Sequence, residues 1–462
     1  MDKQSILNHI DDLTAEQLAN FIIQGIVKLT ELKDTLNLDR SKAVAISATV
    51  KKYEDDKRKV EEEQDRADSI SWDAIRYSNE FALIEWIGNN PTNKYIQQAK
   101  NRINFLEEER SKIKKEKQAI LAKIKSNPNS YDPDKILEFI KNGIINEQDL
   151  FNCDIPKSAI DNLGKIQSPE LKLGITPTSI PEGYTEVYFW GGVGSGKTCA
   201  LGAVLQVAQN KGYLNIAPGP GYLYANQLKN IFSDNGSAND FLPRPTNLES
   251  TQYLPFTLKS TDESRPRSVS LIELSGEIFK CFFYKNANMP FPTGSHENAF
   301  NSLNVFLKSN NRKVHFFFID YDKENRPDRD GLKQSDYLNA ASTYFQNYQV
   351  FGNTTDAIFV VLTKSDLLLD EEGNSVPQNK ILEYTKKYLD QNNYLAFINT
   401  LKNSCQKYGI NGGKLTVEPF SLGKVYFKKI CDFDSSSASK IVEILMKRIP
   451  GTKSSFFDIF NN

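Results

Sequence analysis

The chain has 462 residues, of which 39% are hydrophobic and 25% are charged, as in globular proteins long enough for two or three domains. Its 57 basic and 58 acidic residues give a formal charge of -1, which excludes a general attraction to nucleic acid or anionic lipid. The five cysteines and three histidines are scattered, so neither a disulfide framework nor a zinc site is expected. A cytoplasmic protein is predicted, because the start shows no signal-peptide pattern and no apolar run reaches about 18 residues.

Residues 1–165 are rich in Glu, Lys, Gln and Ile and poor in Gly, which predicts an all-helical N-terminal domain. Within it, an apolar stripe that ends at Gly25 recurs without a gap in a stripe that ends at Gly143. This internal repeat predicts two small helical units, over about 13–46 and 131–163, each with a left-handed glycine at the end of a helix. Each unit buries little surface alone, so it is expected to pack on its twin or on another protein; a chance match of two ordinary helices is the alternative.

Two features are expected between the copies. Apolar residues keep helical spacing over 72–87 and 95–106, on either side of the turn sequence Gly88-Asn-Asn-Pro91, which predicts a helical hairpin. This hairpin resembles the single hairpins of bacterial tetratricopeptide-like arrays. The heptad-like spacing continues to Ile124 and predicts a short intramolecular coiled coil.

Composition changes after the helical region. Residues 166–183 carry three prolines and two glycines and are expected to form an extended connector. From 184 to 450, aromatic and β-branched runs alternate with polar helical stretches, which predicts an α/β domain with a mostly parallel sheet flanked by helices. Residues 451–462 are expected to form a tail. The roles of the long segments 202–244 and 279–311 are left open.

The most informative motif follows the apolar run 187–190 and precedes the apolar helical run 200–205. A strand, a glycine-rich loop and a helix in this order bind triphosphates, because glycines let several N–H groups point at one anion. Lys197 would add positive charge at the terminal phosphates, and Thr198 would offer a hydroxyl to Mg²⁺. An ordinary glycine-rich turn is the alternative. The predicted contacts are Gly191, Gly192, Val193, Gly194, Ser195, Gly196, Lys197, Thr198 and Cys199.

Two later strands end in polar motifs. The strand predicted over 268–274 contains Glu273, a candidate Mg²⁺ ligand, and is followed by Gly276, whose N–H is expected to meet a γ-phosphate. The strand over 357–362 leads into Thr363-Lys364-Ser-Asp366. In such a box a carboxylate accepts the two N–H groups of the guanine edge, which adenine lacks, and a lysine stem lies on the ring. A surface helix cap is the alternative reading of this box.

With these motifs, residues 184–450 resemble P-loop GTPases of the Ras-like and translation-factor class (TRAFAC type). The resemblance implies a P-loop NTPase fold, GTP or GDP as ligand and Mg²⁺ as cofactor. It also implies that Ser421 and Leu422, which follow the strand expected over 414–420, close over the base.

The same resemblance assigns catalytic residues. Thr246 is expected to sense the γ-phosphate through Mg²⁺, with Thr251 as the second choice, and Arg244 to act as an internal arginine finger. Glu277 stands where GTPases of this class carry the glutamine that orients the attacking water. Because Glu273 also replaces an aspartate, slow hydrolysis is expected.

The sequence therefore predicts a GTP-binding molecular switch that slowly hydrolyses GTP with Mg²⁺ and docks a protein partner through its N-terminal helices. A GTP-binding scaffold without catalysis is one alternative. A signalling or defence ATPase is another, for which the residues from Thr363 to Asp366 would be accidental. Nothing in the sequence identifies the partner or the oligomeric state.

Overall fold

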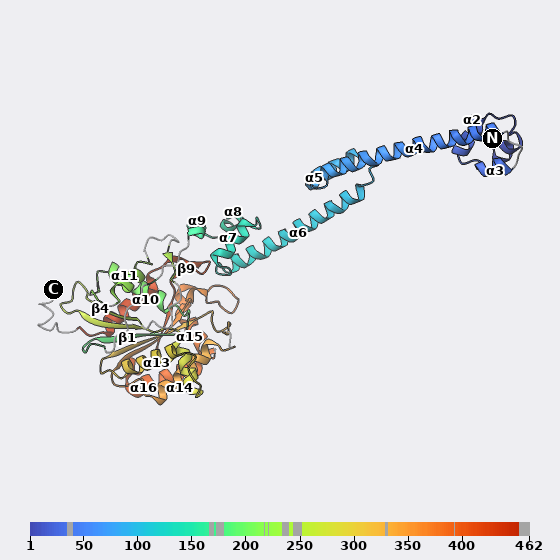
Figure 1. The fold of residues 1–462 in the computed structure, drawn as a ribbon. Coiled ribbons are helices and arrows are strands. Elements are labelled where there is room, and N and C mark those ends of the chain that lie inside the picture. The colour runs from blue at the N-terminus through green and yellow to red at the C-terminus, as the bar shows by residue number, and fades with distance from the viewer. Residues whose placement is uncertain are drawn as a thin grey trace. The chain divides into compact units, whose positions relative to one another are not determined.

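The computed structural model describes residues 1–34, 40–165, 171, 180–216, 218–219, 221–232, 240–243, 252–328, 331–391 and 393–451. The chain divides into two compact units, Met1–Glu116 and Lys117–Asn462, and Figure 1 labels many of its elements. This division differs from the predicted one, which placed a connector at 166–183. Most of that connector lies outside the described residues, and the second helical copy belongs to the C-terminal unit.

The described secondary structure of the N-terminal unit is entirely helical. The two ends have separate cores: Ile6, Leu18 and Ile46 share one hydrophobic cluster, and Trp72 and Trp86 share another. None of the described helices of the protein is both long and apolar enough to cross a membrane. The helices are α1 (Lys3–Asn8), α2 (Ala15–Ile23), α3 (Leu29–Asp34), α4 (Arg40–Ile75), α5 (Glu80–Asn89) and the first part of α6 (Ile96–Ser126).

The helical hairpin expected from the sequence corresponds to α5 and the start of α6, and an additional break separates α4 from α5. The Trp72 ring stacks on Tyr95, with ring centroids 6.0 Å apart, and the indole N–H of Trp86 donates a hydrogen bond to the Ser71 hydroxyl at 2.7 Å. These contacts hold three helices together around two tryptophans.

The two repeat copies end their first helices in the same way. Gly25 and Gly143 have φ values of +75° and +69°, in the left-handed region where glycine avoids a Cβ clash. In both copies the N–H that follows the glycine donates to a phenylalanine carbonyl, Phe21 or Phe139, at 3.0 Å. The second copy comprises α7 (Pro133–Lys141), α8 (Glu147–Phe151), α9 (Lys157–Asp161) and the short 3₁₀ helix η1 (Leu163–Lys165).

The C-terminal unit is a mixed α/β structure, as expected. Its seven-stranded sheet has the order β2-β4-β5-β1-β6-β7-β8. The pairs from β5 to β8 are parallel, whereas β4 is antiparallel to both β5 and β2. The strands are β1 (Thr185–Trp190), β2 (Leu214–Asn215), β4 (Gln252–Leu258), β5 (Arg267–Glu273), β6 (Lys313–Asp320), β7 (Thr355–Thr363) and β8 (Thr416–Phe420).

Helices cover both faces of this sheet (Figure 1), so its central strands are buried along their whole length. Side chains of β1 alternate between the faces: Val187 and Phe189 join one core, and Tyr188 and Trp190 join the other. The first core includes α10 (Lys197–Asn210), α11 (Tyr222–Lys229) and α17 (Ser436–Arg448). The second includes α12 (Ile278–Asn286), α13 (Gly294–Leu307), α14 (Gln334–Asn347), α15 (Ile381–Gln391) and α16 (Leu395–Tyr408).

A second, antiparallel sheet has the order β3 (Asp240–Phe241), β10 (Ile430–Phe433), β9 (Gly423–Tyr426). The turn between β9 and β10 places Phe427 and Lys428 at φ values of +52° and +62°, which non-glycine residues rarely adopt. The Phe427 N–H donates to the Pro128 carbonyl at 3.0 Å, and the Lys428 N–H donates to Asn129 Oδ1 at 2.7 Å. The Phe427 side chain is buried in one cluster with Phe139, so the second helical copy holds this hairpin.

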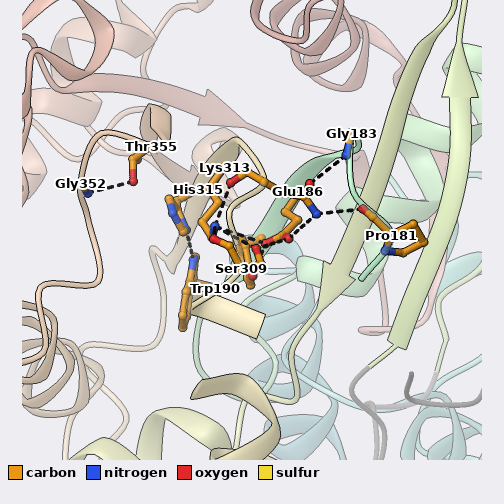
Figure 2. A network of polar contacts seen from close by, with 11 residues as sticks. Pro181, Gly183, Glu186, Trp190, Ser309, Lys313, His315, Gly352 and Thr355 are labelled. Carbon is orange, nitrogen blue, oxygen red and sulfur yellow. Dashed lines mark hydrogen bonds and ion pairs between the residues drawn. The ribbon is translucent and has the colours of Figure 1, made fainter. Parts of the chain in front are cut away.

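A buried ion pair joins the starts of β1 and β6 (Figure 2). Lys313 Nζ lies 3.8 Å from Glu186 Oε2 and donates to the carbonyls of Ser309 and Asn311 at 2.6 and 2.8 Å. The Glu186 carboxylate accepts from the Tyr188 hydroxyl at 2.7 Å, the Asn311 amide at 3.0 Å and the Ser309 hydroxyl. Burial lowers the pKa of Lys313, and the Glu186 charge opposes this effect.

Lys313→Met is expected to lower the free energy of unfolding by about 3–5 kcal/mol, because it leaves the Glu186 charge buried without its cation. The double variant with Glu186→Gln should recover part of this loss. Urea unfolding measures both, with Lys308→Met at an exposed position as the matched control. A Lys313→Met protein as stable as the control would show that the pair does not stabilise the sheet.

Candidate functional site

The carboxyl ends of β1, β5, β6 and β7 lie along one edge of the parallel sheet, because Phe189 pairs with Glu273 and Asp320 pairs with Thr363. The chain leaves β1 toward β5 on one side and later continues to β6 on the other, and ligands of open α/β sheets bind beyond such a reversal of strand order. A pocket of about 1080 Å³ lies there, lined by residues of the loop after β1 and by Gly276, Thr363, Lys364, Asp366 and Leu422.

The loop between β1 and α10 depends on its glycines. Gly194 and Gly196 have φ values of +72° and +86°, and Gly196 is the N-cap residue of α10. At Gly191 a Cβ would lie 2.6 Å from the Phe318 carbonyl oxygen, closer than any real contact. The sequence therefore folds here into a tight turn whose backbone leads directly into the helix N-terminus.

Lys197 turns back over this loop. It is buried, and Nζ donates to the carbonyl oxygens of Gly191 at 2.7 Å and Gly192 at 3.0 Å. Burial lowers the pKa of Lys197 to about 8, although the Glu273 charge opposes this effect. The ammonium thus lies inside the loop that the sequence identified.

Gly276 lies against the same loop from the side of β5. A Cβ at this position would stand 2.2 Å from the Val193 nitrogen and 2.5 Å from the Gly192 carbonyl carbon. Only a glycine fits, because the obstacle is backbone and cannot move aside as a side chain can. The structure therefore brings together two motifs that are about 80 residues apart.

Glu273 is completely buried at the end of β5. Its Oε2 accepts a hydrogen bond from the Tyr224 hydroxyl at 2.6 Å, and its Oε1 accepts one from the Thr198 hydroxyl. Burial and the Glu273 charge both raise the pKa of Tyr224 well above its usual value, so the tyrosine remains a donor. Each carboxylate oxygen therefore has a hydroxyl partner, one from α10 and one from α11.

Thr363 and Lys364 connect the end of β7 to neighbouring loops. The Thr363 hydroxyl donates to the Ser195 carbonyl at 3.0 Å, which ties β7 directly to the loop after β1. Lys364 has a left-handed backbone, with φ of +56°, and its Nζ lies 2.8 Å from Asp320 Oδ2 at the end of β6. Asp320 was not identified from the sequence, although its position at the end of an apolar strand is a signal for it.

Asp366, which lines the pocket, is in contact with Ser421. The Ser421 hydroxyl donates to Asp366 Oδ1 at 2.6 Å and also accepts from the Gly423 N–H at 3.0 Å. Loss of water contact raises the pKa of Asp366, and the Ser421 hydrogen bond opposes this shift. The strand-end motifs at 363–366 and 421–422 are thus in direct contact.

The pocket extends beyond the residues that the sequence suggested. Asn127 and Asn129, which follow α6, and Asp134 of α7 line it together with Lys428 and Lys429 of the β9–β10 hairpin. The sequence offered no signal for this wall, because an amphipathic helix shows that one face is buried but not what covers it.

No protein-family model and no curated protein matches the chain. Among solved structures, the GTP-bound GTPase-like domain of S. cerevisiae Ski7 is similar, with 15% identity over 59% of this chain and 52% of that chain and a TM-score of 0.28. GDP-bound Methanosarcina barkeri Roco2 RocCORdC is similar over 63% and 57%, with 12% identity and a TM-score of 0.25. The chain spans little more than half of either neighbour, and likenesses at these scores are too weak to support a function.

Of the three predicted catalytic residues, the structure describes Glu277 alone. The Glu277 carboxylate lies 3.1 Å from Lys280 Nζ and 3.9 Å from His296 Nε2, and Glu277 is not among the described lining residues. Arg244 and Thr246 lie outside the described residues, as does the second-choice Thr251.

Two further predictions concern Cys199 and a metal ion at Glu273. Cys199 lines the pocket, and burial raises the pKa of its thiol to about 12, so it remains protonated. Among the residues that the structure describes, no cluster of three His, Cys, Asp or Glu side chains could hold a metal ion. A divalent ion at Glu273 would therefore need other oxygen ligands.

Tyr224→Phe is expected to lower the free energy of unfolding by about 1–3 kcal/mol, because it removes a donor from a buried carboxylate. Tyr222→Phe, an exposed position on the same helix, is the matched control and should have little effect. Chemical unfolding of both variants measures the difference. Equal stabilities would mean that Glu273 does not need this hydroxyl.

Lys197 makes stability depend on pH. The pKa of Lys197 falls from 10.5 in a free peptide to about 8 in the folded chain. Between these two pH values the unfolded chain therefore binds more protons than the folded chain. As a result, Lys197 makes the free energy of unfolding increase with pH in this range. The nucleotide-free protein should therefore gain stability relative to Lys197→Met between pH 8 and about 10. Urea unfolding at several pH values tests this, and a pH-independent difference would contradict it.

Proposed function

We propose that the C-terminal unit binds GTP with Mg²⁺ and hydrolyses it slowly, as a molecular switch. One observation carries the proposal: Lys197, Gly276 and Asp366, which are far apart in the sequence, all line one pocket at the carboxyl edge of the sheet. A glycine loop with a buried lysine suits phosphates, and a carboxylate at the other end suits a guanine base.

The phosphate end has the donors that a polyphosphate requires. Lys197 Nζ is held by two carbonyl oxygens, Gly191 and Gly192. Carbonyls are neutral acceptors, and charge-assisted bonds to phosphate are about twice as strong, so a bound anion competes well for this ammonium. The N-terminus of α10 lies directly behind the loop and favours negative charge.

Thr198 and Glu273 fit a magnesium ion. Both offer oxygen atoms, the ligands that Mg²⁺ prefers, and the two side chains are in hydrogen-bond contact. Thr198 would hold the ion through its hydroxyl, and Glu273 through water, while the remaining ligands would come from phosphate and water. When bound, the ion neutralises phosphate charge.

At the other end of the pocket, Asp366 would accept the two N–H groups of the guanine edge. The Ser421 hydroxyl orients its carboxylate, and Lys364 is directed away toward Asp320 by an ion pair. Lys364 lines the pocket, and its aliphatic stem is long enough to lie on a base. Adenine would present no donor pair to Asp366, which argues against the ATPase alternative.

The environment of Glu277 bears on hydrolysis. Its Oε2 is paired with Lys280, and this ammonium competes with a water molecule for the charge of the carboxylate. This contact favours slow turnover, and it also supports the second candidate function, a GTP-binding scaffold that does not hydrolyse. Docking of a protein partner through the N-terminal helices is part of the proposal.

Asp366→Asn is expected to weaken GTP binding at least about tenfold and to improve binding of xanthosine triphosphate, because an amide cannot accept both guanine N–H groups. Competition against a fluorescent guanine nucleotide measures both affinities, and ATP should compete poorly throughout.

Lys197→Ala should remove binding of every nucleotide from a folded protein. Equal affinities of the wild-type protein for GTP and ATP would contradict the guanine assignment.

A further inference from the structure

A second ammonium lies over the loop after β1. The chain leaves β6 at Asp320, and Lys323 follows in the turn segment. A Cβ at Gly194 would stand 3.8 Å from Lys323 Nζ. Asp322 and Arg326 of the same segment line the pocket, so this segment borders the site.

The neighbouring cations have partners of their own. Lys364 pairs with Asp320 at 2.8 Å, and Lys280 pairs with Glu277 at 3.1 Å. Within the described part of the chain, the ammonium of Lys323 makes no hydrogen bond and no ion pair. Lys323 is only partly exposed to solvent. Its ammonium therefore lies near the glycine loop without full hydration and without an anion in contact.

The charges around Lys323 come from three segments. Burial lowers its pKa, and Lys364 and Lys280 lower it further, whereas Asp320 and Glu277 raise it. Its charge also acts on Lys197 and lowers the pKa of that lysine. The two ammonium groups repel each other, and an anion between them would relieve the repulsion.

We propose that Lys323 contacts the terminal phosphates of the bound nucleoside triphosphate, as a second lysine beside Lys197. The inference rests on the proposed function, because it requires a polyphosphate at the loop after β1. It assigns to Lys323 the stabilising charge that the sequence analysis expected from Arg244.

Such a cation would also act on hydrolysis. The water oxygen forms a bond to the γ-phosphorus, and the bond from that phosphorus to the β–γ bridging oxygen breaks. The bridging oxygen keeps the electron pair as part of the diphosphate, and the proton of water ends on the released phosphate. An ammonium beside the terminal phosphates stabilises the charge that grows on the leaving oxygen.

The test compares Lys323→Gln, Lys323→Met and Lys323→Arg with Lys308→Gln, a change at an exposed position elsewhere. Affinities for GDP and for a non-hydrolysable GTP analogue are measured by titration, together with single-turnover hydrolysis of GTP. The two neutral variants should bind the triphosphate about tenfold or more weakly, bind GDP with a smaller loss, and hydrolyse more slowly. Lys323→Arg should keep more of both properties, and Lys308→Gln should match the wild-type protein.

The inference fails if either neutral variant is folded and keeps both the wild-type ratio of GTP to GDP affinity and the wild-type rate. Two neutral variants are used so that a folding defect in one still leaves a result. Failure of the proposed function is distinct, because the wild-type protein would then bind no guanine nucleotide. Wild-type binding that Lys197→Ala abolishes and neutral Lys323 variants leave unchanged would overturn the role of Lys323 alone.

Discussion

The contact between the backbone of Gly276 and the loop after β1 is the constraint on which the site depends. β5 and β1 are parallel neighbours, and Glu273 lies opposite Phe189, so the two strands end at the same level of the sheet. Where they leave, no room remains for a Cβ at 276. Because the two backbones touch, the last carboxylate of β5 is directed at the start of α10, where Thr198 meets it.

Hydroxyl groups connect Glu273 and the loop after β1 to neighbouring elements of the pocket. Tyr224 of α11 shares Glu273 with Thr198, and the hydroxyl of Thr363 reaches the carbonyl of Ser195. Charged groups that are buried in this way are stable only when each has partners. The loop is therefore fixed from three sides before any ligand arrives, and this reduces the ordering that binding would require.

The central sheet could be predicted because its strands are continuous apolar runs. Parallel strands buried on both faces, such as those at 187–190 and 357–362, carry no alternation and are bounded by polar motifs. β3, β9 and β10 could not be found in this way, because strands of two to four residues give no period. The sequence also predicts one helix over about 378–406, which the structure divides into α15 and α16.

Other contacts of the site could not be predicted from the sequence, for a different reason. Tyr224 lies in a segment without a motif, and its role arises only where α11 packs beside α10. Glu277 is predicted to be catalytic from its position after Gly276, but Lys280 lies one helical turn away on the same face. Their ion pair is a local contact that the motif alone does not reveal. Motif spacing thus located the pocket, whereas the partners of each polar side chain depend on tertiary packing.

The second helical copy lies in the same compact unit as the pocket, and Asp134 of its first helix lines that pocket. Two adjacent non-glycine residues with positive φ, Phe427 and Lys428, cost about 1–3 kcal/mol each. Pro128 and Asn129 accept their N–H groups, and Phe139 shares the cluster that buries Phe427. Without these contacts the turn would lose what offsets its strain, and the lysines of the hairpin that line the pocket would lose their position. The second compact unit begins at Lys117, within α6, and so includes the residues that hold the hairpin.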